Sequence, residues 1–168
     1  PTSSCRAAEP MRPARALVSV VPVAALFGWA RPRRRRPEEF AAEAVCPDDP
    51  VLRGFLDANA ADIARSQPDF DPDAVPSFLR LIRRRGELVG VLVGEPLGDE
   101  LHVRLDYVAP AFRDVAAGHW LYGPGRAVFT AAGFRRAVAS PLTHEHQRYL
   151  EALGFVREGN RLVKDLAQ

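Results

Sequence analysis

The sequence predicts an α+β domain of three layers, with a mixed, mainly antiparallel central sheet flanked by helices. Three strand-like segments follow one another between residues 78 and 108 with only short turns between them, which is typical of an antiparallel meander. After residue 110 the hydrophobic period becomes helical, and the chain ends on a pair of short strands. The expected order is therefore strand, helix, three strands, helix, strand, helix and two strands.

The first strand and the first helix are predicted from local signals. Residues 40–45 alternate moderately between apolar and polar side chains, as a short strand does. The residues Asp48-Asp49-Pro50 favour a helix start, because acidic side chains suit its positive end and proline suits its first turn. Apolar spacing extends this helix, or a broken pair of helices, to about Arg65. Residues 67–76 hold three prolines and three aspartates and predict a loop.

The meander is predicted at residues 78–82, 88–93 and 101–108. In the last of these segments, apolar side chains at positions 101, 103, 105 and 107 alternate with polar ones at 102, 104 and 106. Such alternation is typical of a strand with one buried face.

The second half of the domain alternates helices and short strands. A helix is expected over residues 116–132, and the Gly123-Pro124-Gly125 sequence interrupts it because proline cannot donate a helical hydrogen bond. The remaining elements are a strand at 135–140, a helix at 143–153 and strands at 154–157 and 161–166.

Charge divides the 168-residue chain into two unlike parts. Residues 1–37 hold eight arginines and one acidic residue, whereas residues 38–168 hold fifteen basic and twenty acidic residues. We therefore expect a basic leader followed by one acidic domain, and no nucleic-acid partner for that domain. The acidic balance favours a cationic acceptor molecule.

The leader allows two interpretations. Its apolar residues 16–30 are too few for a helix that crosses a bilayer, and the arginine run Arg33–Arg36 follows closely. It is either a flexible, poorly folded leader or the truncated end of a membrane segment whose arginines mark the cytoplasmic side. A cytoplasmic protein, with a possible membrane tether, is the expectation.

Cysteine and histidine spacing predicts no metal site. Cys5 and Cys46 are the two cysteines, and no CxxC or Cys/His pattern is present. His144 and His146 flank Glu145, but residues two apart lie on different sides of a helix, so a solvated helix start is the expectation there.

Residues 106–121 read Asp-Tyr-Val-Ala-Pro-Ala-Phe-Arg-Asp-Val-Ala-Ala-Gly-His-Trp-Leu. Together with Ala132-Gly133-Phe134, the sequence from Tyr149 to Gly154-Phe155, and the closing strands, this segment makes residues 38–168 resemble the GCN5-related N-acetyltransferase (GNAT) superfamily. The family pattern is a strand, then V-x-P-x-(F/Y)-R-x-x-G-x-(G/A)-x-x-L. Ala116 stands where that pattern has its first loop glycine.

The resemblance implies a site for acetyl-CoA. Backbone N–H groups at the start of a helix suit a pyrophosphate, and in such families the preceding strand splays from its neighbour and offers its edge to the pantetheine arm. The expected binding residues are Tyr107, Val108, Arg113, Asp114, Val115, Ala116, Ala117 and Gly118.

The resemblance also suggests two catalytic candidates. Many GNAT enzymes protonate the departing thiolate with a tyrosine four residues before the glycine of the Gly-Phe turn, where this chain has Leu150, with Tyr149 one place earlier. Tyr149 is either this general acid or a packing tyrosine. Asp106 is a candidate base for the amine, or a charged strand residue in solvent.

Two functions follow from these observations. The first is an N-acyltransferase that moves an acetyl group from acetyl-CoA to a small-molecule or peptide amine by direct attack. The alternative is a non-catalytic GNAT-like binding or regulatory domain appended to a membrane segment. The acceptor and the oligomeric state stay open.

Overall fold

The computed structural model describes residues 39–74, 77–114, 116–141 and 143–167. The chain divides into two units, residues 1–36 and 37–168, and the described residues all belong to the second. The expectations for the leader, residues 1–37, therefore lie outside the described residues. Within those ranges, no helix is long and apolar enough to cross a membrane.

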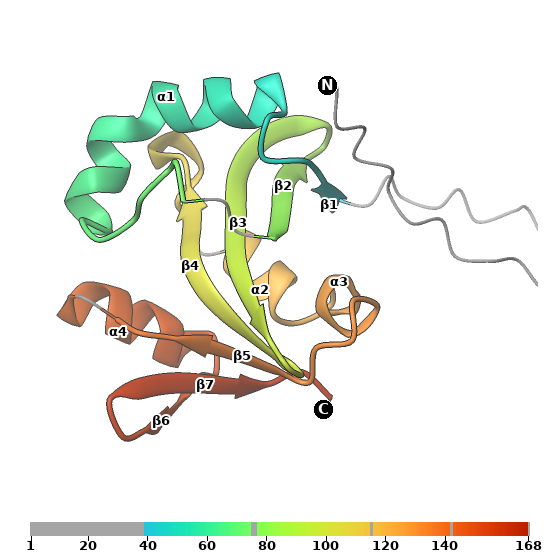
Figure 1. Cartoon of the computed structure of the whole chain (residues 1–168), viewed down its shortest axis with the longest axis vertical. Helices are drawn as coiled ribbons and strands as arrows, with labels where there is room; N and C mark the ends of the chain where they lie inside the picture. The colour runs from blue at the N-terminus through green and yellow to red at the C-terminus, as the bar shows by residue number, and fades with distance from the viewer. Residues whose placement is uncertain (1–38, 75–76, 115, 142, 168) are drawn as a thin grey trace, which may run out of the picture. The chain divides into compact units, whose positions relative to one another are not determined.

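The centre of the domain is a seven-stranded sheet in the order β1-β2-β3-β4-β5-β7-β6 (Figure 1). Neighbouring strands are antiparallel except β4 and β5, which are parallel. The strands are β1 (Phe40–Ala44), β2 (Phe78–Arg84), β3 (Glu87–Leu97), β4 (Glu100–Val108), β5 (Arg136–Ala139), β6 (Val156–Glu158) and β7 (Arg161–Asp165). The predicted mixed, mainly antiparallel sheet is confirmed.

Four α-helices flank the sheet: α1 (Pro50–Ser66), α2 (Ala116–Leu121), α3 (Ala127–Thr130) and α4 (His144–Ala152). Helix α1 is continuous, and the Asp49 carboxylate caps it by accepting from the Val51 N–H at 2.8 Å. The predicted interruption is present, since α2 ends at Leu121 and α3 begins at Ala127. Within it, Gly125 packs directly on the Trp120 ring and leaves no room for a side chain.

Two hydrophobic clusters hold the helices to the sheet. Helix α1 packs through Leu52, Leu56 and Ile63 on β2, β3 and β4. The second cluster joins the sheet to α2, α3 and α4, where Phe129 and Leu150 are fully buried. Both sides of the sheet are therefore covered, and β4 lies between the two clusters.

A β-bulge in β4 changes which side chains share a face. The register with β3 shifts between Val103 and Leu105, which leaves Arg104 without a partner in the ladder. Leu101 and Val103 consequently pack with the α2–α4 cluster, whereas Leu105 and Tyr107 pack with α1. The predicted single buried face of residues 101–108 is therefore wrong: the alternation changes sides at the bulge.

Candidate functional site

Strands β4 and β5 separate halfway along β4. Their parallel pairing covers Glu100–Val103 of β4 and ends at Ala139 of β5, yet β4 continues to Val108 (Figure 1). Sequence reasoning expected this splay from the family resemblance alone, and the structure contains it. Among the described residues, no strand lies beside the second half of β4 on the β5 side, so this edge of β4 is free.

Backbone direction decides which residues offer that free edge. The Ala109 N–H donates to the Val89 carbonyl at 2.9 Å, and the Tyr107 carbonyl faces Gly90 so closely that a Cβ there would lie 2.6 Å from it. Because backbone groups alternate along a strand, Val108 and Asp106 direct theirs to the opposite side. Of the expected binding residues on β4, Val108 therefore offers this edge, whereas the backbone of Tyr107 faces β3.

A cavity of about 380 Å³ lies in this gap. Its walls come from the end of α1, the end of β4, the start of α2 and the first turns of α4. Seven of the predicted site residues line it: Asp106, Tyr107, Val108, Arg113, Ala117, Gly118 and Tyr149. Asp114 and Ala116 are not part of the wall, and Val115 lies outside the described residues.

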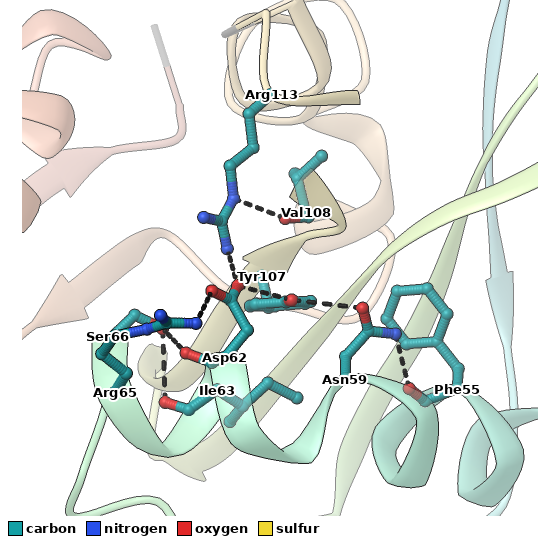
Figure 2. Close-up of polar contacts among 9 residues, drawn as sticks. All are labelled: Phe55, Asn59, Asp62, Ile63, Arg65, Ser66, Tyr107, Val108 and Arg113. Carbon is teal, nitrogen blue, oxygen red and sulfur yellow. Dashed lines mark hydrogen bonds and ion pairs between the residues drawn. The ribbon is translucent and has the colours of Figure 1, made fainter. Parts of the chain in front are cut away.

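Arg113 crosses the mouth of the cavity to α1. Its Nε donates to the Val108 carbonyl at 2.9 Å, and an Nη atom makes a close ion pair with Asp62 (Figure 2). The guanidinium also lies 5.2 Å from the centre of the Tyr107 ring. The residue expected to contact phosphate is thus held by a carboxylate and by the free edge of β4.

Asp62 organises this contact from helix α1. Its Oδ2 accepts from the Tyr107 hydroxyl at 2.7 Å, and its Oδ1 from Arg65 at 2.8 Å (Figure 2). The hydrogen bond from Tyr107, followed by the charge of Arg113, holds the pKa of the Asp62 carboxyl below its usual value. Burial, aided by Asp62, raises the pKa of Tyr107 to about 12.

A carboxylate of the protein itself, that of Asp114, caps the start of α2. Asp114 Oδ1 accepts from the Ala116 N–H at 3.1 Å, and its Oδ2 pairs with Arg84 at 2.6 Å. The hydrogen bond from Arg84 lowers the pKa of Asp114, so this group is an anion at the positive end of the helix. Ala117 and Gly118, which follow this cap in α2, line the cavity.

Gly118 makes room for Tyr149. A Cβ on Gly118 would lie 2.3 Å from the Tyr149 hydroxyl oxygen and 3.0 Å from Leu153. Tyr149 therefore extends from α4 across the cavity to the start of α2, half-buried, as part of the wall. Burial raises the pKa of Tyr149, so its hydroxyl keeps its proton at neutral pH.

Asp106 lies next to Tyr149, on the α2–α4 side of the sheet. Its Oδ2 and the Tyr122 hydroxyl are both buried and make no hydrogen bond within the described part of the chain. Burial raises the pKa of Asp106 to about 6, and the hydroxyls of Tyr122 and Tyr149 beside it oppose that increase. The alternative of a strand residue in solvent is excluded, because helices cover this face.

His146 is a site residue that sequence reasoning placed in solvent. It lines the cavity, its two ring nitrogens are buried without hydrogen-bond partners among the described residues, and burial lowers its pKa. The spacing of His146, Leu150 and Leu153, at i, i+4 and i+7, could have placed it on the inner face of α4.

The described residues contain no group of three or more His, Cys, Asp or Glu side chains that could hold a metal ion. Cys46 lies in the connection between β1 and α1, whereas Cys5 lies outside the described residues.

No protein-family profile matches the chain, and no curated protein matches its sequence. The fold, however, matches solved acetyltransferases. The spermidine N-acetyltransferase of Vibrio cholerae, solved with CoA and spermine, aligns with a TM-score of 0.60 at 12% identity, over 77% of this chain and 96% of that one. A ribosomal-protein alanine acetyltransferase from Vibrio fischeri aligns with a TM-score of 0.56 at 15% identity, over 76% and 93%.

A GNAT-family acetyltransferase from Streptococcus pneumoniae aligns with a TM-score of 0.55 at 15% identity, over 76% of this chain and 99% of that one. At these identities the likeness establishes the fold. The chain therefore has the fold of the GNAT acetyltransferases, as its sequence predicts.

Proposed function

We propose that this protein is an N-acyltransferase that moves an acetyl group from acetyl-CoA to an amine. The observation that carries the proposal is the free edge of β4 above a cavity, between strands that separate at Val103. The GNAT fold supports it, since the V. cholerae neighbour was solved with CoA. Acetyl-CoA supplies the acyl group as an activated thioester.

Five of the proposed binding residues line the cavity, and the other three are the intervening positions 114–116 of the chain. Val108 offers backbone groups to the pantetheine arm, and the N–H groups of Ala117 and Gly118 face the pyrophosphate. Arg113 contributes its charge once a phosphate competes with Asp62 for the guanidinium. The complete proposed set is Tyr107, Val108, Arg113, Asp114, Val115, Ala116, Ala117 and Gly118.

Two side chains are proposed to move protons. As the C–N bond forms and the C–S bond breaks, the amine nitrogen loses a proton and the sulfur gains one. Asp106, ionised above a pKa of about 6, takes the proton from the nitrogen, directly or through water. Tyr149, which lies beside Asp106 and is protonated at neutral pH, donates its proton to the sulfur and regains one from Asp106.

Binding is tested by thermal unfolding with acetyl-CoA. Acetyl-CoA at millimolar concentration should raise the melting temperature, and Arg113→Glu should abolish the increase by replacing a cation with an anion. Arg126→Glu is the matched control, because Arg126 is exposed and is not among the residues that line the cavity. An unchanged melting temperature in the wild type contradicts the proposal.

Turnover is tested by following release of the CoA thiol in the presence of spermidine, a short peptide with a free amino terminus, or glutamate. Tyr149→Phe and Asp106→Asn should each lower kcat by about a hundredfold or more while the thermal shift with acetyl-CoA persists. If both variants had the same kcat as the wild type, neither residue would have the proposed role in the mechanism.

A non-catalytic binding domain is the second candidate. Two observations favour it: Asp114 already caps the Ala116 N–H, and Asp62 already holds Arg113. Both contacts compete with phosphate for the groups that would bind it. Saturable binding of acetyl-CoA, without thiol release for any of the three amines, would favour this candidate over the enzyme.

A further inference from the structure

A second cavity, of about 650 Å³, adjoins the first. It is bounded by the loop that follows α1, by β3 and β4 beside the bulge, and by the end of β5. Gln67 and His146 line both cavities, so the two spaces meet at these side chains. A molecule in the second cavity would therefore lie next to His146.

The imidazole of His146 is placed for contact with a polar group. Its ring stacks on that of Tyr149, with 6.4 Å between ring centres and an angle of 26° between the planes. Its backbone N–H is already capped by Thr143 at 3.1 Å, while neither ring nitrogen has a partner in the described ranges. Buried polar atoms ordinarily have partners, so the unprotonated ring nitrogen is free to accept a proton or a hydrogen bond from a bound molecule, and the other can donate one.

The surroundings keep this imidazole neutral. Burial lowers the pKa of His146, and its place in the first turn of α4 further disfavours a cation. The charged groups of the first cavity are Asp62, Arg65, Asp106, Arg113 and Glu145. Those of the second are Asp69, Asp71, Glu95 and Arg104.

The charged side chains that line the second cavity determine whether it attracts a cation or an anion. Three carboxylates, Asp69, Asp71 and Glu95, face one guanidinium, and that Arg104 group already donates to Glu95 at 3.0 Å. The excess of negative charge attracts a cation and repels an anion. An amine that enters here therefore arrives as its ammonium form, which cannot attack a thioester until it loses a proton.

We propose that His146 is the catalytic base that removes this first proton, from an ammonium group that enters through the second cavity. The inference rests on the proposed acyltransferase function. The free amine then attacks the thioester carbonyl carbon, the C–N bond forms and the C–S bond breaks. The nitrogen gives its second proton to Asp106, and the sulfur receives one from Tyr149. Asp106 then returns its proton to the phenolate oxygen of Tyr149 beside it, so both groups are restored. The net reaction releases one proton, which leaves from His146 to solvent.

The test compares His146→Asn with His144→Asn, using spermidine as the acceptor and CoA thiol release as the assay. His144 is exposed on the same helical turn and serves as the matched control. At pH 7, His146→Asn should lower kcat/KM by about a hundredfold, the scale of a lost general base, while His144→Asn should leave it unchanged. The thermal shift with acetyl-CoA should be the same in all three proteins.

The pH profile separates a base from a structural residue. In the wild type, kcat/KM should fall only below the lowered pKa of His146. In His146→Asn it should instead keep rising towards the pKa of the free amine, near about 10, so that the difference between the two proteins nearly closes there. A merely structural role would give a constant difference at all pH values.

A binding measurement supplements the kinetics. The ring C–H resonances of His146, identified by their loss in His146→Asn, should shift when spermidine is added to the CoA-saturated protein, and those of His144 should not. Unchanged His146 resonances, or equal pH profiles for wild type and His146→Asn, would overturn the inference while acetyl transfer stands. Binding of acetyl-CoA without turnover of any amine would overturn it as well, and an absence of binding would overturn the proposed function itself.

Discussion

Replacement of Asp106 by asparagine should stabilise the protein at neutral pH. Burial raises the pKa of this carboxyl from 3.8 to about 6, so the folded state binds a proton more tightly than the unfolded state. The stabilisation that this provides is complete below about pH 4 and is lost as the pH rises to about 6 and beyond. Above that range the buried carboxylate destabilises the fold, whereas a neutral amide of the same shape does not.

The magnitude follows from the two pKa values. A difference between 3.8 and about 6 corresponds to about 3 kcal/mol at pH 7.5, on the scale of 1.36 kcal/mol for each tenfold change in proton affinity. The asparagine variant should therefore gain about 2–3 kcal/mol on the wild type between pH 4 and pH 7.5. This gain would accompany the loss of turnover expected for the same variant.

Urea unfolding at several pH values measures this difference directly. The exposed Asp57 on α1 provides the control, since Asp57→Asn should shift the free energy of unfolding by less than about 0.5 kcal/mol at every pH. A stability difference between Asp106→Asn and the wild type that stays constant from pH 4 to pH 7.5 would refute the assignment of a raised pKa to Asp106.

Two further substitutions test the cavity mouth. Gly118→Ala should lower the free energy of unfolding by about 1–3 kcal/mol and weaken acetyl-CoA binding, because its Cβ would lie 2.3 Å from the Tyr149 hydroxyl. Gly54→Ala, in an open position of α1, should instead raise stability by up to about 1 kcal/mol; similar unfolding curves for the two variants would contradict this packing. Asp62→Asn should release Arg113 and lower the Kd for acetyl-CoA about two- to fivefold, the scale of an exposed ion pair; calorimetric titration that finds weaker binding would argue against competition at Arg113.

Element types and their order along the chain were predictable because their signals are local. The Asp49-Pro50 helix start, the glycine and proline break after α2, and the turns of the meander all lie within a few residues of the elements that they define. The β-bulge at Arg104 was not predictable, because it depends on the register with β3 and not on the sequence of β4. Because the bulge was not predicted, Asp106 was placed on a polar face of the strand, whereas in the structure helices cover the face on which Asp106 lies.

The site residues that belong to a sequence motif were predictable. Those that only the tertiary fold brings to the site were not. The residues from Val108 to Gly118 were found through their pattern, and five of the ten described residues in this segment line the cavity. Asp62, which pairs with Arg113, belongs to a helix far earlier in the chain and carries no signal of its own. His146 did carry a helical spacing signal, but its importance depends on a second cavity that only the folded chain contains.

The most direct test of the central claim is hydrogen exchange measured by mass spectrometry with and without acetyl-CoA. The backbone N–H groups of Asp106 and Val108 face the gap between β4 and β5, so acetyl-CoA bound there should slow exchange in peptides that cover residues 104–109 and 116–121. Peptides from β1 should exchange at an unchanged rate. Protection of residues 104–109 would support acyl-CoA binding at the free edge of β4, and its absence at saturating acetyl-CoA would contradict it.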